Sequence, residues 1–313
     1  MPKPDVLMLG TYPPWDMEAF DASYVLHRFW ETTDKQEFLA AHGSKIRAVA
    51  TRGDLVCGGD LIAALPNLEI IGCYGVGTDG IDFTATRPRG IKVTNTPDVL
   101  TDDVADLAIG LMISIARLLP QGDVLVRQGR WREQGMPLAT SFSGKRLGIV
   151  GMGRIAAAVA RRAEAFNMEI SYFNRTKRDG LAYRHFDSLA GLAANCDFLV
   201  AAITGGPATA KLIDAHVLKA LGPEGYFVNV ARGSVVDEEA LLDALESKTI
   251  KGAALDVFTN EPDINRRFFN LENTVLQPHV GSASVETRKA MGQLVRDNLA
   301  AHFAGRPLLT EVA

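Results

Sequence analysis

A glycine-rich turn constrains the fold of this chain more than any other feature of its sequence. Residues 145–156 read Lys-Arg-Leu-Gly-Ile-Val-Gly-Met-Gly-Arg-Ile-Ala, with apolar, β-favouring residues before the turn and a helical pattern after it. The stretch therefore predicts a buried strand that ends at Val150, a tight turn at Gly151 and a helix that begins at Arg154.

The spacing of the glycines in this turn suits a dinucleotide. Gly151 permits the tight turn, and Gly153 lets the backbone approach a diphosphate with no Cβ in the way. A helix that begins at Arg154 directs unpaired N–H groups at the same anion. Ala156 replaces the third glycine of the usual fingerprint and is small enough for close helix–strand packing. An ordinary structural turn is the alternative, but the strand and helix around the turn favour the dinucleotide.

A basic turn follows the next predicted strand, residues 168–173. An acidic residue here would hold the ribose 2′-hydroxyl of NAD, but the turn reads Asn174-Arg-Thr-Lys-Arg178. The cations and the hydroxyl of Thr176 suit the 2′-phosphate of NADP, which Arg175 can grip with its planar guanidinium. The alternative is a solvated basic turn. The sequence thus predicts NADP, with NADPH preferred over NADH.

The length and charge of the chain limit the other possibilities. A chain of 313 residues exceeds one compact core, so two domains are expected. A formal net charge of −4 argues against nucleic-acid and membrane partners. The cysteines (Cys57, Cys73 and Cys196) lack motif spacing and predict a reducing, cytoplasmic setting without zinc or another metal. The first five residues lack the apolar region of a signal peptide, so no leader segment is expected.

The N-terminal third alternates short apolar stretches with helical patterns, which predicts a small parallel α/β domain. Strands are expected at residues 6–9, 46–50, 69–74 and 91–94, and helices at residues 22–42 and 60–65. The glycine-rich segment 74–82 follows the third of these strands. Because parallel sheets bind ligands at the carboxyl ends of their strands, this loop is a candidate ligand loop, with an ordinary flexible turn as the alternative.

The rest of the chain predicts a second, larger domain. A long helix with one broad apolar face is expected from Thr101 to Pro120, followed by a polar segment in which Trp131 is exposed. Six further strands are expected at residues 146–150, 170–173, 198–203, 226–230, 252–256 and 274–276. Interleaved with helices, they match a Rossmann-type doubly wound parallel sheet. A last helix, residues 285–303, is expected to return to the N-terminal domain.

Side chains capable of chemistry follow three strands of this second series. Arg232 can hold a carboxylate through two parallel hydrogen bonds. The next segment offers Asp256 and Glu261, and His279 follows the last strand. A lone histidine is usually structural, but beside Glu261 it becomes a proton donor suited to ketone reduction. The remaining histidines have no such setting.

These motifs together resemble a known family. Segments 74–82, 150–155, 229–233, 255–262 and 278–281 all occur in the order found in the D-isomer-specific 2-hydroxyacid dehydrogenases. The resemblance covers nearly the whole chain. Segments 94–103 and 174–177 are most similar to the NADPH-preferring glyoxylate/hydroxypyruvate reductases, including the hydroxyphenylpyruvate reductases.

The resemblance implies a two-domain enzyme that reduces small 2-keto acids such as glyoxylate and hydroxypyruvate to glycolate and D-glycerate. It implies a flavodoxin-like, discontinuous substrate-binding domain of residues 1–98 and 286–313, and an NADP-binding Rossmann domain of residues 99–285. The cleft between the two domains is expected to close on substrate. A homodimer through the Rossmann domain, with Trp131 at the interface, is also implied.

The family's site residues carry over to matching positions. Arg232 would orient the substrate, His279 would deliver the proton, Glu261 would tune the histidine, and the N–H groups of Val76 and Gly77 would bind the substrate carboxylate. The implied cofactor-binding residues are Val104, Gly151, Met152, Gly153, Arg154, Ile155, Asn174, Arg175, Thr176, Ile203, Val230, Ala231, Asp256 and Gly281. Segment 203–209 departs from the family's usual proline-containing run, so cofactor contacts from this loop are less specific.

Other functions compete with this interpretation. Hydroxyphenylpyruvate reductase is one alternative. An NAD-linked D-lactate or phosphoglycerate dehydrogenase is another, but position 174 is an asparagine and not the acidic residue that such an enzyme would use. A corepressor-like sensor of NADP(H) is the non-enzyme alternative, and the intact set Arg232, Glu261 and His279 argues against it. Segment 144–146 lacks the glycine spacing of a P-loop, which excludes that class of ATPase.

Overall fold

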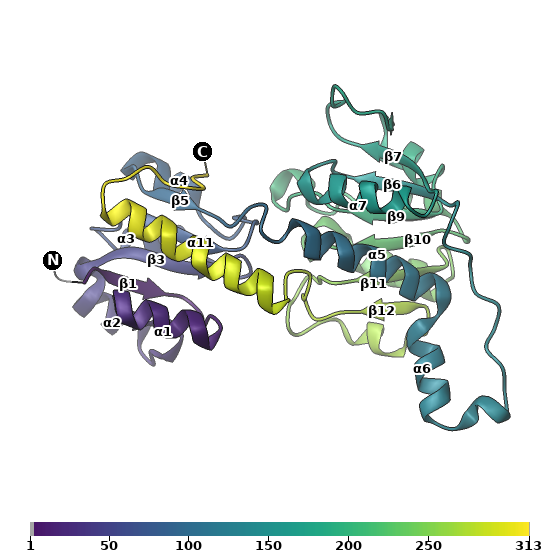
Figure 1. The fold of residues 1–313 in the computed structure, drawn as a ribbon, viewed down its shortest axis with the longest axis horizontal. Coiled ribbons are helices and arrows are strands. Elements are labelled where there is room, and N and C mark those ends of the chain that lie inside the picture. The colour runs from purple at the N-terminus through teal and green to yellow at the C-terminus, as the bar shows by residue number, and fades with distance from the viewer. Residues whose placement is uncertain (1–2, 313) are drawn as a thin grey trace. The chain divides into compact units, whose positions relative to one another are not determined.

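The computed structural model describes residues 3–312 and divides the chain into two compact units. The first unit comprises Met1–Leu100 and Ser282–Ala313, and the second comprises Thr101–Gly281. Each unit has its own sheet and its own helices (Figure 1). Each also has its own buried apolar cluster. The expected α/β fold class is confirmed.

A five-stranded sheet forms the first unit, in the order β2-β1-β3-β4-β5 with every neighbouring pair parallel. This is the flavodoxin-like strand order. Strand β4 is buried along its whole length because helices cover both faces, and such strands are continuous apolar runs. The strands are β1 (Asp5–Met8), β2 (Val25–Arg28), β3 (Ile46–Arg52), β4 (Ile70–Tyr74) and β5 (Lys92–Thr94).

Helix α11, from Val285 to Phe303, belongs to this unit although it lies at the far end of the chain. It packs directly on β4, since a Cβ at Gly72 would lie 3.0 Å from the side chain of Val295. The other helices of the unit are α1 (Pro14–Ser23), α2 (Lys35–His42), α3 (Gly59–Ala63), α4 (Phe83–Thr86) and the 3₁₀ turns η1 (Phe29–Glu31), η2 (Gly43–Lys45) and η3 (Arg87–Arg89).

The helix expected at residues 22–42 is wrong. In its place the chain forms β2, η1 and α2, and an additional helix, α1, comes before them. Val25–Arg28 pairs with β1, and His27 lies 2.7 Å from the carboxylate of Asp5 on that strand. Asp34 then begins α2 anew by accepting hydrogen bonds from the N–H groups of Gln36 and Glu37.

The second unit has a seven-stranded parallel sheet in the order β12-β11-β10-β9-β6-β7-β8. The strand order reverses between β6 and β9, as in a doubly wound Rossmann sheet, which confirms that expectation. The short edge strand β8 was not expected. The strands are β6 (Arg146–Val150), β7 (Glu169–Phe173), β8 (Arg184–His185), β9 (Phe198–Ala201), β10 (Tyr226–Asn229), β11 (Gly252–Leu255) and β12 (Thr274–Leu276).

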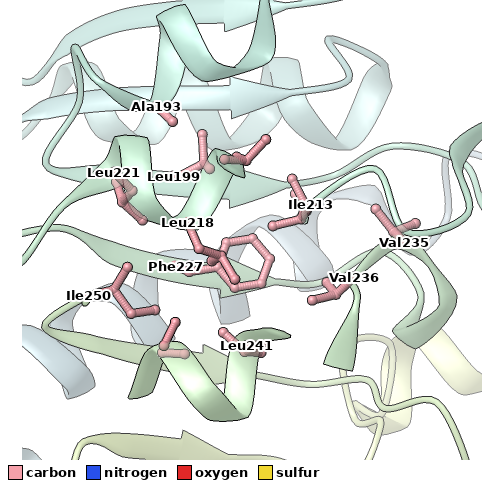
Figure 2. Close-up of a cluster of buried hydrophobic side chains, with 14 of the residues drawn as sticks. Ala193, Leu199, Ile213, Leu218, Leu221, Phe227, Val235, Val236, Leu241 and Ile250 are labelled. Carbon is pink, nitrogen blue, oxygen red and sulfur yellow. The ribbon is translucent and has the colours of Figure 1, made fainter. Parts of the chain in front are cut away.

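A large apolar cluster lies between this sheet and the helices that follow β9 and β10 (Figure 2). Phe227 of β10 is fully buried against Leu218 of α9 and Leu241 of α10. Burying one such side chain stabilises the fold by about 1.5–3 kcal/mol. The helices of the unit are α5 (Thr101–Arg117), α6 (Leu119–Arg127), α7 (Arg154–Glu164), α8 (Leu189–Ala193), α9 (Ala215–Leu221), α10 (Glu238–Glu246), η4 (Arg130–Arg132), η5 (Pro207–Thr209), η6 (Gly233–Val235) and η7 (Arg266–Asn270).

Pro120 begins a helix rather than ending one. Helix α5 stops at Arg117 because Leu118 adopts a left-handed conformation with φ 54° and ψ 41°. Helix α6 then starts at Leu119 with Pro120 in its first turn, where the missing N–H costs no hydrogen bond. Trp131, beyond α6, is 71% exposed.

Candidate active site

The glycine turn connects β6 to α7 and forms a cradle at the helix N-terminus. Gly151 has φ +88°, and a Cβ there would lie 2.6 Å from the Cβ of Ile203, so this glycine is required by the fold. Gly153 precedes α7, and a Cβ there would meet nothing within 4 Å. Its glycine therefore leaves open space at the start of a helix, where N–H groups bind an anion such as a diphosphate. Ala156 is fully buried, as close packing of the helix requires.

The side chains after β7 divide into two groups. Asn174 accepts a hydrogen bond from the N–H of Met152 at 2.7 Å, and the guanidinium of Arg178 donates to the Met152 carbonyl, so both support the glycine turn. Arg175 and Lys177 are exposed and make no hydrogen bond or ion pair with residues 3–312. Arg175 and Lys177 are thus the two cations of the basic turn whose side chains no other residue in 3–312 engages.

A histidine–glutamate pair lies at the carboxyl ends of β11 and β12. His279 Nδ1 is 2.6 Å from Glu261 Oε2, and the other oxygen of Glu261 accepts a hydrogen bond from the N–H of Phe258 at 2.8 Å. Because an ionised carboxylate only accepts hydrogen bonds, Nδ1 carries the proton in this pair and Nε2 faces away from the glutamate. The two side chains are 36% and 25% exposed, so a ligand can reach the ring.

The surroundings of Glu261 keep it ionised. Burial raises the pKa of this carboxyl, but the hydrogen bond and charge of His279, the N–H of Phe258 and the charge of Arg232 outweigh burial. The pKa of Glu261 therefore lies below its ordinary value of 4.5. An ionised partner is what a histidine that gains and loses a proton requires.

Arg232 reaches the same place from the loop after β10. A Cβ at Gly233 would lie 2.0 Å from the backbone of Phe258, so the Arg232 loop lies directly on the loop that carries Glu261. Arg232 is half-buried, and its guanidinium also donates to the carbonyl of Ala231 at 2.8 Å. The structure thus brings together the three side chains that the sequence singled out for chemistry.

Two buried polar residues hold these loops in place. Asn229, 1% exposed at the end of β10, donates to the Arg232 carbonyl at 3.0 Å and accepts from the N–H of Ala231 at 3.0 Å. Asn229 was not among the residues expected in the site, although its place as a polar residue at the end of an apolar strand was a signal for it.

Asp256 supports the histidine loop in the same way. Its carboxylate is 2% exposed and accepts from the N–H groups of Val280 at 2.7 Å and Gly281 at 2.9 Å. Burial raises its pKa, while the two N–H groups lower it, and the pKa remains above the ordinary value. Both of its oxygens are thus engaged by the protein. The expected role of Asp256 in binding the cofactor stays a prediction.

The remaining expected cofactor residues lie near the carboxyl ends of the strands, where α/β sheets bind ligands. Val104 lies next to Gly281, where a Cβ would be 3.4 Å from its side chain. Val230 and Ala231 are buried directly after β10. Arg154 and Ile155 open α7, Ile203 contacts the glycine turn, and Thr176 is exposed beside Arg175.

Val76 and Gly77 belong to the first unit, in the loop after β4. Gly75 has φ +153° and lies against Gly53, with a Cβ position 3.4 Å from the Gly53 backbone. Within residues 3–312, no group accepts a hydrogen bond from the N–H of Val76 or of Gly77. Such backbone N–H groups can bind an anion.

Two hollows of the first unit lie elsewhere. They measure about 350 and 500 Å³ and are lined by residues at the amino ends of β3, β4 and β5, including Arg47, Glu69 and Lys92. Parallel sheets bind ligands at the opposite edge, so neither hollow is assigned to the site.

Among residues 3–312, no single helix is both long and apolar enough to cross a membrane, and α5 and α6 reach that length and composition only together, with a 63° bend between them. The same residues contain no group of three or more His, Cys, Asp or Glu side chains that could hold a metal ion.

Curated relatives match the chain over nearly all of its length. A hydroxyphenylpyruvate reductase from Plectranthus scutellarioides is 47% identical, and a glyoxylate/hydroxypyruvate reductase from Arabidopsis thaliana is 46% identical, each over 98% of both chains. A 2-ketogluconate reductase from Gluconobacter oxydans is 45% identical over 99% of both chains.

Solved structures agree with these relatives. A 2-hydroxyacid dehydrogenase from Ketogulonicigenium vulgare has a TM-score of 0.93 at 47% identity and covers 100% of this chain and 99% of its own. An NADPH-dependent glyoxylate/hydroxypyruvate reductase from Sinorhizobium meliloti, in complex with NADP and malonate, has a TM-score of 0.93 at 44% identity over 99% of this chain and 97% of its own.

The matching family model covers much of the second unit. It describes the NAD-binding domain of the D-isomer-specific 2-hydroxyacid dehydrogenases and matches residues 109–281. Fold, relatives and family model agree with the resemblance found in the sequence. The chain therefore belongs to the D-isomer-specific 2-hydroxyacid dehydrogenase family and is an oxidoreductase with an NAD(P)-binding domain.

Proposed function

We propose that this chain uses NADPH to reduce glyoxylate and hydroxypyruvate to glycolate and D-glycerate, with His279 as the acid/base. The observation that supports this proposal best is the 2.6 Å contact between His279 Nδ1 and Glu261, on a loop that lies against the Arg232 loop. A guanidinium and a protonatable ring in the same place suit an anionic substrate whose carbonyl oxygen must gain a proton.

Each side chain has a distinct part in the proposed reaction. Arg232 holds the substrate carboxylate and keto oxygen, and the N–H groups of Val76 and Gly77 bind the other carboxylate oxygen. His279 Nε2 gives its proton to the carbonyl oxygen, and Glu261 stabilises the charged ring before that transfer. When bound, the reduced nicotinamide supplies the hydride to the carbonyl carbon. The carbonyl thereby gains one hydride and one proton and becomes the alcohol.

The proposed preference for NADPH rests on the turn after β7. Arg175 and Lys177 are exposed and unpaired within residues 3–312, and no carboxylate ends that strand to bind a ribose hydroxyl. The S. meliloti structure that is similar to this chain was solved with NADP. Arg175→Ala should weaken NADPH binding by tenfold or more, since a charge-assisted pair is worth about 1.5–3 kcal/mol. NADH binding should change little, and equal losses for the two cofactors would contradict the assignment.

Hydroxyphenylpyruvate reduction is the second candidate, because a reductase of that name is 47% identical over 98% of both chains. The test is the rate of cofactor absorbance loss with glyoxylate, hydroxypyruvate, 4-hydroxyphenylpyruvate and 2-ketogluconate, each with NADPH and NADH. We expect the highest kcat/KM for glyoxylate or hydroxypyruvate with NADPH. A higher value for the aromatic acid would favour the second candidate, and no reduction of any of the four would refute both.

We also propose that the chain forms a homodimer through the second unit. Several exposed apolar side chains of that unit lie on α6 and on the segment that follows it. They are Leu119, Val124, Val126, Trp131 and Leu138. Contiguous exposed apolar side chains typically mark an interface. The cytoplasmic location expected from the sparse cysteines likewise stays a prediction.

A further inference from the structure

The turn after β4 is held by hydrogen bonds to three successive carbonyls. Each carbonyl accepts from a different donor within the first unit: Gly75 from the N–H of Thr96 at 2.9 Å, Val76 from Asn95 Nδ2 at 2.9 Å, and Gly77 from Cys73 Sγ at 3.4 Å. Thr96 also accepts, through its hydroxyl, from the N–H of Gly75 at 3.0 Å. All the donors come from β4 itself or from the segment that follows β5.

These bonds decide where the next N–H group in the turn points. In a trans peptide, the carbonyl of one residue and the N–H of the next point in opposite directions. The Asn95 amide holds the Val76 carbonyl, and it therefore directs the Gly77 N–H to the opposite side. No group in residues 3–312 accepts a hydrogen bond from that N–H. A backbone N–H fixed in advance binds an anion without the cost of reorganisation.

We propose that Asn95 is a positioning residue that orients the Gly77 N–H toward the carboxylate of the substrate. The proposal rests on the proposed function, in which that N–H binds a 2-keto acid. It assigns a task to the Thr94–Asp103 segment, which otherwise supplies no group to the reaction. Asn95 touches Val76 and not the substrate, so it acts through the turn.

The C-terminal segment holds Asn95 in turn. The hydroxyl of Thr310 donates to the Asn95 carbonyl at 2.6 Å, and the Asn95 N–H donates to the Thr310 carbonyl at 3.3 Å. Asn298, fully buried on α11, binds Thr310 through both its amide nitrogen at 2.9 Å and its amide oxygen at 3.1 Å. A buried amide is costly unless it is fully hydrogen-bonded, and this contact gives Asn298 its structural task. Residues at the end of the chain thus support a turn near residue 76.

The test is Asn95→Ala, with Asn67→Ala as a matched control. The Asn67 amide donates to the carbonyl of Ser44 at 2.7 Å in the same unit, so both variants lose one amide–carbonyl bond. Steady-state kinetics should show KM for the keto acid about tenfold higher in Asn95→Ala, with kcat nearly unchanged, because the carboxylate is bound equally in the ground and transition states. The dissociation constant of oxalate from the NADPH-loaded protein should rise by the same factor, and that of NADPH should not change. Asn67→Ala should change neither KM nor kcat, and neither the oxalate nor the NADPH dissociation constant.

A second variant covers the case in which Asn95→Ala folds poorly. Thr310→Val removes the hydroxyl bond to Asn95 and should raise the same KM and the same oxalate constant by a smaller factor. The inference is overturned if Asn95→Ala and Thr310→Val match Asn67→Ala in both constants, or if they lower kcat alone. Failure of the proposed function would look different, because the unaltered chain would then reduce no 2-keto acid at all.

Discussion

His279 has little freedom to turn within its loop. Its backbone is in the left-handed region at φ 54°, and its N–H donates to the carbonyl of Asp256 at 2.9 Å. Its ring is fixed by Glu261 at 2.6 Å. Non-glycine residues with positive φ persist where surrounding contacts determine the conformation, and such residues cluster at functional sites. The ring is therefore pre-oriented, with Nε2 as the nitrogen that can exchange a proton with a substrate.

Replacing His279 tests this role directly. His279→Ala should lower kcat by about 10²–10⁴-fold, since general acid catalysis contributes that much, and should leave NADPH affinity unchanged. Stopped-flow fluorescence measures the affinity, and steady-state kinetics measure kcat. His216→Ala, at an exposed position on α9, is the control and should retain full activity. Unchanged turnover in His279→Ala would exclude the histidine as the proton donor.

Glu261 makes the stability of the second unit depend on pH. Its pKa in the folded state lies below the ordinary value of 4.5. A lowered carboxyl pKa stabilises the fold fully above the unfolded value, and this stabilisation is lost as the pH falls through the folded value. The free energy of unfolding of Glu261→Gln should therefore differ most from that of the parent above pH 4.5, and the difference should shrink in acid. Urea unfolding at several pH values measures it, and a difference that grows in acid would contradict the assignment.

At the scale of elements, the two glycines in the turn between β6 and α7 differ in what requires them. Gly151 is needed by the protein itself, because of its φ of +88° and its contact with Ile203. Gly153 is not crowded by any protein atom within 4 Å of its Cβ position. Since the fold leaves this space open at the start of a helix, we predict that Gly153 serves a bound diphosphate.

Two alanine variants test this difference. Gly151→Ala should lower the free energy of unfolding by about 1–3 kcal/mol through backbone strain and the clash with Ile203. Gly153→Ala should keep the stability of the cofactor-free protein within about 0.5 kcal/mol, because nothing occupies that space, but should weaken NADPH binding. Thermal unfolding with and without NADPH measures both effects. Equal NADPH affinity in Gly153→Ala and the parent would remove the diphosphate assignment.

Long apolar strands and the glycine fingerprint could be predicted from the sequence because their signals are local. Strand β6 lies at residues 146–150 as expected, and α11 has the expected bounds. Two of the edge strands, β2 and β8, were missed for a physical reason. Val25–Arg28 and Arg184–His185 are short and contain charged or imidazole side chains, and only pairing with a neighbour makes them strands.

The candidate site was predictable to a similar extent. Arg232, Glu261 and His279 could be singled out because each lies in a loop that follows a strand of the second unit, within three to six residues of its end. The hydrogen bonds that support the loops could not be predicted, because the partners are distant in sequence. Asn174 holds Met152 and Asn95 holds Val76 across about twenty residues, and Asn298 reaches Thr310 only once α11 is in place. Such contacts are decided by the packing of elements and not by any local pattern.

At the scale of the whole molecule, both ends of the chain build the first unit. Helix α11 packs on β4, and the last residues extend the sheet, since the N–H of Val312 donates to the carbonyl of Val93 at 2.8 Å. The second unit is one continuous segment, Thr101–Gly281. The exposed apolar side chains between α6 and Leu138 belong to this continuous unit and leave it with a surface suited to association.

The proposed homodimer can be tested on that surface. Light scattering after gel filtration should give twice the chain mass of 33.8 kDa. Trp131 is 71% exposed and Leu138 is fully exposed, so replacing both with Glu should cost the monomer little stability. The charges would be buried without partners in a dimer, and the double variant should elute as a monomer. Leu309→Glu, at a site in the first unit that is 55% exposed, is the control and should remain dimeric. A double variant that stays dimeric would place the interface elsewhere. A monomeric parent would exclude the homodimer.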